Sequence, residues 1–425
     1  MNIYRYPSKD SWQQLLKRPA LDFSNVEEKV NAVLLQVKKD GDKALRKFTA
    51  EFDKAVVDNL EVTEQEKIFA LNQVNTELFE AIKLAAENIT AFHRKQLQAT
   101  DKMEIMPGVS CWRKNVGIEK VGLYVPGGTA PLFSTVLMLT IPAVLAGCKE
   151  IIICTPPSAE GKVHPAILAA AGYVGINKIF KVGGVQAIAA MTFGTNTIPK
   201  VNKIFGPGNQ YVTAAKQIVQ KYGVAIDMPA GPSEVAVFAD KTADPSFVAA
   251  DLLSQAEHGG DSHVLLVTDY EPLIALVNDE LQSQLSVLPR KEIAETALGN
   301  SKYILVDNKS QAMDLLNEYA PEHLILSCDA PEELAEMVIN AGSVFLGHYS
   351  PESVGDYASG TNHTLPTGGY AKTYSGVSVD SFVKKITFQY LSEEGLKSIA
   401  PAVVVMAETE GLKAHAEAVR VRLKK

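Results

Sequence analysis

The chain has 425 residues, of which 46% are hydrophobic and 21% are charged, and its formal net charge is −8. This length exceeds what one ordinary hydrophobic core holds, so we expect two or more domains. The composition is that of a soluble globular protein, and its acidic balance offers no positive field for a phosphate backbone, so nucleic-acid binding is not expected.

The cysteines and the apolar segments predict a cytoplasmic protein. The chain has four cysteines, at positions 111, 148, 154 and 328, and none forms a C-x-x-C pair, which fits a reducing compartment rather than a disulfide framework. The first residues, MNIYRYPSKDSW, lack an apolar run behind a basic start, so we expect no signal peptide. The longest apolar stretch, residues 136–146, is too short to span a bilayer.

In chain order, the first predicted elements are helical. Residues 26–52 and 64–96 carry apolar side chains at three- and four-residue spacing among many charges. Short apolar runs follow and alternate with Ala- and Leu-rich helical segments. We expect strands at residues 121–125, 150–154, 178–182 and 203–205.

A second series of the same kind begins after a cluster of Pro and Gly at residues 228–233, where we place a domain break. Its expected strands are residues 234–238, 263–267, 303–306, 323–326 and 343–346, with helices at 245–258 and 271–288 between them. Strands that alternate with helices predict parallel sheets covered on both faces, so the fold class is α/β. After about residue 380 the tail is expected to be helical.

No G-x-G-x-x-G sequence follows any of these strands. The pairs Gly127-Gly128 and Gly183-Gly184 come after strands but lack that spacing. A dinucleotide, if one binds, is therefore not held by the usual glycine fingerprint.

Two histidine motifs are candidates for metal binding and proton transfer. Gln255 and His258 lie three residues apart at the end of a predicted helix, where an imidazole can be a zinc ligand, although a capping or core role is commoner for such a pair. Glu322 and His323 stand where a loop enters an apolar strand and could share proton transfer, although, taken alone, a solvated acid beside a packed histidine is the commoner arrangement.

Three further segments are weaker candidates. The polar loop at residues 355–367 offers Asp356 and His363, although such loops are commonly plain surface turns. His415 lies beside an apolar helical stripe and taken alone is an interface or core residue. The glycines of residues 205–209, a segment that ends in Asn209, let a ligand approach the backbone, although a plain tight turn is equally typical. The segment 121–128, which contains Tyr124, is similar.

Together and in this order, these motifs resemble the histidinol dehydrogenase family over nearly the whole chain. The strings that carry the resemblance are VGLYVPGGTAPLFSTVLMLTIPA, KIFGPGN, AGPSEV, LLSQAEHGGDS, APEHL and GDYASGTNHTLPT. The resemblance implies two incomplete Rossmann-like domains with parallel-rich sheets and small helical segments at both termini. We accordingly expect an N-terminal arm (1–24), a discontinuous first α/β domain (25–120 and 234–380), an NAD-binding second α/β domain (121–233) and a C-terminal helical segment (381–425).

The resemblance also implies residue roles. Glu322 and His323 match the catalytic pair. The implied zinc ligands are Gln255, His258, Asp356 and His415, the last donated by the other subunit of a homodimer. Substrate contacts are implied for Ser233, His363 and Glu410, together with His323 and the four zinc ligands. NAD contacts are implied for Tyr124, Gln186 and Asn209.

On this basis we expect a zinc enzyme that oxidises L-histidinol to L-histidine, the last step of histidine biosynthesis, with two NAD consumed in turn. His323, taken to have a pKa near its ordinary value, would handle protons in both steps, and Glu322 would activate water for the second. A relative of the same fold that oxidises another polar alcohol is the main alternative. A zinc hydrolase would leave the NAD-contact matches without a role, and a non-catalytic binding protein would show no turnover.

Overall fold

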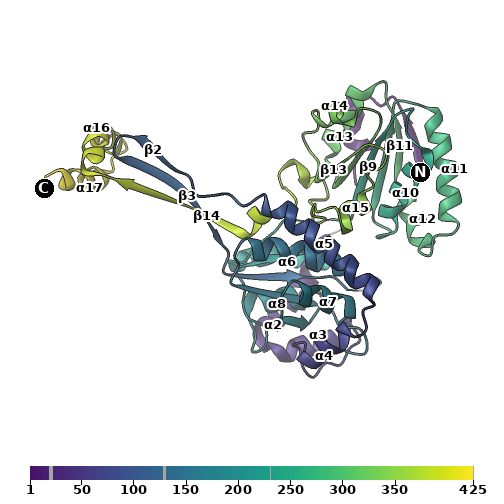
Figure 1. Cartoon of the computed structure of the whole chain (residues 1–425), viewed down its shortest axis with the longest axis horizontal. Coiled ribbons are helices and arrows are strands. Elements are labelled where there is room, and N and C mark those ends of the chain that lie inside the picture. Colours follow the sequence, from purple (N-terminus) through teal and green to yellow (C-terminus); the bar gives the residue numbers. More distant parts are fainter. Residues whose placement is uncertain (19–22, 128–130, 230, 425) are drawn as a thin grey trace.

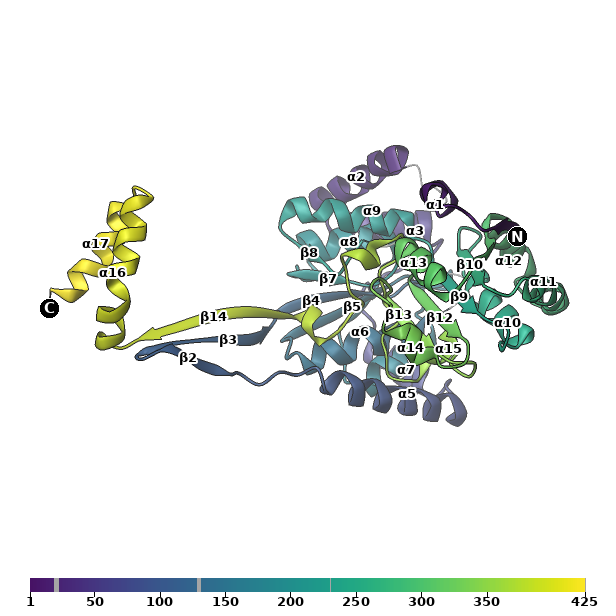
Figure 2. The same ribbon diagram turned by 90° about the horizontal axis from the view of Figure 1, so that it is seen from above.

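The computed structural model describes residues 1–18, 23–127, 131–229 and 231–424. Gly128 of the predicted glycine pair and Ala230 of the predicted domain break lie outside the described residues. Figure 1 shows two α/β bodies and a long arm that projects from one of them, and Figure 2 shows the same arm from above with two helices at its tip. Among the described residues, no helix is long and apolar enough to cross a membrane.

The first of these, the six-stranded body, is built on a wholly parallel sheet with strand order β1-β11-β10-β9-β12-β13. The strands are β1 (Asn2–Arg5), β9 (Glu234–Ala239), β10 (His263–Thr268), β11 (Lys302–Leu305), β12 (His323–Ser327) and β13 (Ser343–Leu346). One face is covered by α10 (Pro245–Ala256), α11 (Pro272–Leu285) and α12 (Lys291–Asn300). The other face is covered by α1 (Lys9–Leu15), α13 (Lys309–Tyr319) and α14 (Pro331–Ala335). Because helices cover both faces, the central strands β9, β10 and β12 are buried throughout.

The five-stranded body has a second parallel sheet, with strand order β6-β5-β4-β7-β8. Its strands are β4 (Lys120–Tyr124), β5 (Glu150–Thr155), β6 (Ile179–Lys181), β7 (Lys203–Phe205) and β8 (Ala225–Ile226). The helices α2 (Phe23–Asp40), α3 (Asp42–Phe52), α8 (Gly184–Phe193) and α9 (Gln210–Val219) pack on one face. On the other pack α4 (Glu64–Leu71), α5 (Thr76–Arg94), α6 (Phe133–Leu145) and α7 (Pro165–Tyr173).

This packing corrects the predicted domain division. Residues 25–120 were assigned to the same domain as residues 234–380, but α2, α3, α4 and α5 share their cores with the five-stranded sheet. The apolar stripe of a helix predicts that it must be covered, but it does not say which of two similar sheets will cover it. The N-terminal segment 1–24, expected as an arm of its own, begins instead with a strand of the six-stranded sheet, because β1 pairs with β11 at its edge.

The arm corrects the second expectation, that residues 381–425 are helical. It is a three-stranded antiparallel sheet of β2 (Lys102–Met106), β3 (Val109–Gly117) and β14 (Val383–Leu391), followed by α16 (Glu393–Thr409) and α17 (Lys413–Leu423). Most residues of β14 are exposed, so no alternation of buried and exposed side chains marks it as a strand. The remaining short elements are the helix α15 (Glu352–Tyr357) and 3-10 turns at Gln220–Tyr222, Tyr370–Lys372 and Val379–Phe382.

Candidate active site

The predicted catalytic pair lies at the amino end of β12, at the edge of the six-stranded sheet. Both side chains are buried, with Glu322 at 7% and His323 at 3% relative exposure. Their neighbour in the sheet is the first residue of β9, Glu234. The backbone N–H of Glu234 donates to Glu322 Oε2 at 2.9 Å, and His323 Nδ1 donates to the Glu234 carbonyl oxygen at 3.1 Å. One backbone position therefore fixes the orientation of both side chains and leaves His323 Nε2 as the nitrogen free for chemistry.

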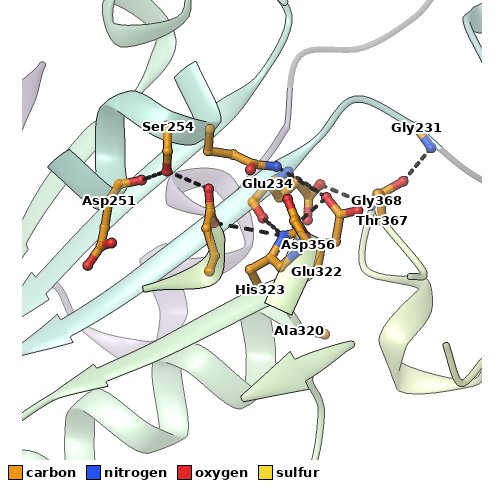
Figure 3. A network of polar contacts seen from close by, with 12 residues as sticks. Gly231, Glu234, Asp251, Ser254, Ala320, Glu322, His323, Asp356, Thr367 and Gly368 are labelled. Atoms are coloured by element: carbon orange, nitrogen blue, oxygen red, sulfur yellow. Dashed lines mark hydrogen bonds and ion pairs between the residues drawn. The ribbon is translucent and has the colours of Figure 1, made fainter. Parts of the chain in front are cut away.

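Two further carboxyl groups face this imidazole from α15 (Glu352–Tyr357), and Figure 3 shows one of them, Asp356. Asp356 Oδ1 lies 3.4 Å from His323 Nε2, and Glu352 Oε2 lies 4.0 Å from His323 Nδ1. These three facing atoms, His323 Nε2, Asp356 Oδ1 and Glu352 Oε2, are buried and make no hydrogen bond to the described residues. Asp356 was expected in a loop, but the structure places it on a short helix, one turn after Glu352.

The surrounding acids change the protonation of the site. Burial disfavours the charged form of His323, but the carboxylates of Glu322, Asp356 and Glu352 outweigh it and raise the histidine's pKa above its ordinary value. Burial raises the pKa values of Glu322 and Glu352. Although burial acts in the same sense on Asp356, the His323 imidazole beside it, whose Nε2 lies 3.4 Å away, lowers the pKa of this acid. The assumption of an ordinary pKa for His323 was therefore wrong, because the sequence did not show how many carboxylates surround it.

The predicted metal ligands are only partly together in one chain. Gln255 lies in the last turn of α10 and is 1% exposed. Its amide is oriented so that both the nitrogen and the oxygen have partners: the nitrogen donates to Glu352 Oε1 at 2.9 Å, and the oxygen accepts from Glu234 N at 3.0 Å. His258 is exposed just past the end of α10, near enough to Asp356 to interact electrostatically with it. Among the described residues, no group of three His, Cys, Asp or Glu side chains could hold a metal ion.

His415 and Glu410 are not brought to this site within one chain. His415 is on α17, Glu410 is the C-cap of α16, and both are exposed. Figures 1 and 2 place these helices at the tip of the arm, far from β12 and α15.

Of the other predicted substrate contacts, His363 connects the two bodies, whereas Ser233 stays within the six-stranded body. Ser233 directly precedes β9, and its carbonyl oxygen accepts from His263 N. His363 Nδ1 donates to the Asp356 carbonyl oxygen at 2.9 Å, so its Nε2 accepts from the hydroxyl of Thr135, in the first turn of α6, at 3.1 Å. Burial lowers the pKa of His363, which favours this neutral form. A substrate contact through His363 would have to replace the bond to Thr135.

Sequence reasoning missed the residues that support the pair. The partly buried Arg18 forms an ion pair with the buried Glu234 carboxylate, which also accepts from the backbone N–H of Gly368 at 2.9 Å. Ser254 donates to Glu352 Oε1 at 2.6 Å. Only the helical spacing between Glu352 and Asp356 could have signalled the first acid, since i and i+4 share a helix face.

The predicted NAD contacts, from three different elements, line one cavity of about 890 Å³ at the carboxyl edge of the five-stranded sheet. Tyr124 ends β4, Gln186 lies in the first turn of α8, and Asn209 caps α9 by accepting from the N–H groups of Tyr211 and Val212. The Tyr124 hydroxyl accepts from Gly184 N at 3.0 Å, and burial raises its pKa to about 12, so the phenol is neutral. The volume is in the range of small-molecule and cofactor sites.

Comparisons with known proteins agree on one family. The family model for histidinol dehydrogenase matches residues 16–423. A histidinol dehydrogenase of Bacteroides thetaiotaomicron is 59% identical over 423 residues, covering 100% of this chain and 99% of that protein, and one of Xylella fastidiosa is 50% identical, covering 97% and 98%. The crystal structure of histidinol dehydrogenase from Elizabethkingia anophelis superposes with a TM-score of 0.98 at 54% identity, covering 100% of this chain and 98% of that one. The chain belongs to the histidinol dehydrogenase family of oxidoreductases.

Proposed function

We propose that this chain oxidises L-histidinol through L-histidinaldehyde to L-histidine in two NAD-linked steps at a zinc-containing site, in the cytoplasm. The observation that carries the proposal is the pair of Glu322 and His323, oriented by the Glu234 backbone with His323 Nε2 left free. The names of relatives that are 59% and 50% identical to this chain support the substrate.

Gln255, His258 and Asp356, with His415 of the partner subunit, would hold the zinc ion. The donor set suits zinc, and the buried Asp356 Oδ1, which has no hydrogen-bond partner among the described residues, leaves an oxygen available for a cation. When bound, the ion would orient the amino alcohol and neutralise part of the carboxylate charge that raises the pKa of His323.

His323 acts as the base in the alcohol step. Because its Nδ1 donates to a backbone carbonyl, only Nε2 can accept the proton of the substrate hydroxyl. As that proton leaves, the carbon loses a hydride, for which bound NAD would supply the acceptor. The products are the aldehyde, protonated His323 and NADH.

Glu322 acts in the aldehyde step. Its Oε2 accepts from Glu234 N, which holds the carboxyl in place, and its buried position favours proton uptake. It removes a proton from water as the oxygen bonds to the aldehyde carbon, giving a gem-diol. Once His323 has released its first proton to solvent, it takes a hydroxyl proton from that diol, and a second bound NAD would supply the acceptor for the hydride that leaves the carbon, giving the carboxylic acid.

A shared site in a homodimer follows from the same proposal. The arm carries His415 away from its own active site, and its tip exposes apolar side chains such as Val405 and Met406, at 63% and 64% relative exposure. Such a surface on a projecting arm fits a second copy of this chain, whose site would then receive His415.

The test counts products. Purified, zinc-loaded protein is mixed with L-histidinol and excess NAD, and NADH and histidine are measured in the same sample. We expect two NADH for each histidine and no free aldehyde. One NADH with accumulated aldehyde would contradict the second step, and no NADH at all would contradict the proposed substrate.

A further inference from the structure

Two hydrogen-bond acceptors without adequate donors lie side by side in the wall of the 890 Å³ cavity. Asp53 follows the last residue of α3, and Gln186 lies across from it on α8. The Gln186 amide nitrogen donates to Asp53 Oδ2 at 3.4 Å, which is a long contact. The amide oxygen Oε1 of Gln186 is buried and has no hydrogen-bond partner among the described residues. Both groups therefore present acceptors to whatever fills the cavity.

Asp53 occupies this position at a cost. Within the part of the chain that the structure describes, its carboxyl forms no ion pair, and burial raises its pKa to about 6. A carboxylate at the carboxyl end of a helix also meets the negative end of the helix dipole. Capping or helix stability therefore does not explain an acid here, whereas a ligand that donates hydrogen bonds does.

We propose that Asp53 and Gln186 bind the two hydroxyls of the adenosine ribose of NAD and that Asp53 selects NAD over NADP. This inference rests on the proposed function, because it requires a dinucleotide in this cavity. A vicinal diol supplies two donors for two neighbouring acceptors. A 2′-phosphate would remove one donor and bring a negative charge against a partly desolvated carboxylate.

The cavity lining favours the adenosine ribose over the nicotinamide ribose. Val30, Val33 and Ile167 give the same cavity an apolar wall that suits a purine ring. The reacting ring must instead reach His323, which belongs to the other body. The half of the dinucleotide near Asp53 is therefore the adenosine half.

The test compares NAD and NADP in the zinc-loaded full-length enzyme, native and Asp53→Asn, with L-histidinol as substrate. We expect the variant to raise the KM for NAD with little change in kcat, and to raise the NADP-to-NAD ratio of kcat/KM about tenfold or more. The matched control is Glu51→Gln, which removes the same charge from an exposed residue in the last turn of α3. An unchanged NADP-to-NAD ratio in Asp53→Asn, or an equal change in the control, would overturn the proposal.

A double-mutant cycle with Gln186→Ala tests whether the two acceptors share one diol. The losses in NAD affinity should be less than additive in the double variant, because either change alone disrupts the same pair of bonds. Additive losses would overturn the shared diol. Failure of the proposed function looks different, since the native enzyme would then reduce neither dinucleotide.

Discussion

The two α/β bodies use opposite edges of their sheets. In the five-stranded body the cavity lies beyond the carboxyl ends of β4, β6 and β7, whereas in the six-stranded body the site gathers at the amino ends of β9 and β12. Ligands of open parallel sheets ordinarily bind at the carboxyl edge. The first body follows that rule and the second does not.

Helix polarity explains why the two edges suit different chemistry. In β-α-β units, helices begin at the carboxyl edge of the sheet and end at its amino edge. The cavity is therefore bordered by the starts of α8 and α9, whose partial positive charge favours phosphate groups. Gln255 and His258 lie at the end of α10, where the partial negative charge favours a metal ion or an imidazolium. One edge is suited to a dinucleotide and the other to a cation and a proton carrier.

The largest loss of activity should come from a substitution at the amino edge of the six-stranded sheet. Changing His323→Asn removes the proton acceptor for both steps, so kcat should fall by about 10²–10⁴-fold with histidinol and with histidinaldehyde alike. In Glu322→Gln the aldehyde reaction should slow more than the alcohol reaction. Steady-state rates with each substrate measure this, and equal losses in both reactions of Glu322→Gln would contradict the division of roles.

The next prediction concerns the arm. It tests whether the active site at the amino edge of one chain contains a residue of the other chain. His258→Asn and His415→Asn should each lose zinc and activity when expressed alone. Co-expressed, they should recover about a quarter of native activity, because half of the dimers are mixed and each mixed dimer has one intact site.

Zinc content and NADH production are measured in the co-expressed mixture and in the separated mixed dimers, which should show about half of native activity. If His415 served its own chain, every site in a mixed dimer would carry one substitution, and no activity would return. An exposed change on α17 such as Glu417→Gln serves as the control and should remain fully active in any combination.

The accuracy of prediction from the sequence also differs between the regions. Nine of the eleven parallel strands were predicted to within one or two residues, β12 among them, because buried strands are continuous apolar runs. The edge strands β1 and β8 were not predicted. The arm was missed because a strand exposed on both faces has no such pattern. The docking of α2 and α5 on the five-stranded sheet was missed because an apolar stripe does not identify its partner.

The candidate site was predictable where motifs were continuous in the chain and not where they meet only in space. Tyr124, Gln186 and Asn209 came from separate motifs, yet the structure brings them to one cavity. Asp53 and Arg18 stand in segments with no recognisable motif, and their importance depends on neighbours more than 100 residues away. The electrostatic state of His323 likewise depends on α15, a short helix that the sequence presented as a loop.

A substitution at the carboxyl edge of the five-stranded sheet should change the KM for NAD much more than the KM for histidinol. Gly206, in the turn before α9, has φ +125, and a Cβ there would lie 2.0 Å from the carbonyl oxygen of Tyr124. Gly206→Ala must therefore displace the turn that carries Asn209, and we expect the KM for NAD to rise about tenfold with a much smaller change in the KM for histidinol. Gly223→Ala is a matched control, because its φ is also positive but a Cβ there meets open space. A rise in both KM values together would contradict the separation of the two edges.

The smallest effect concerns stability and comes from Asp53. Its folded pKa of about 6 lies above the value of about 3.9 for an unfolded aspartate, so the protonated form is favoured by folding. The stability that this group contributes is present in full below pH 4 and is lost as the pH rises through 6. Asp53→Asn cannot ionise, so it should melt about 1–4 °C above the native protein at pH 7.5, with a smaller difference at pH 4.5. Scanning calorimetry without dinucleotide measures this, with Glu51→Gln expected to show no such pH dependence. A difference in melting temperature that is the same at both pH values would mean that the carboxylate carries no desolvation cost, and the argument that binding rather than folding explains this acid would lose its support.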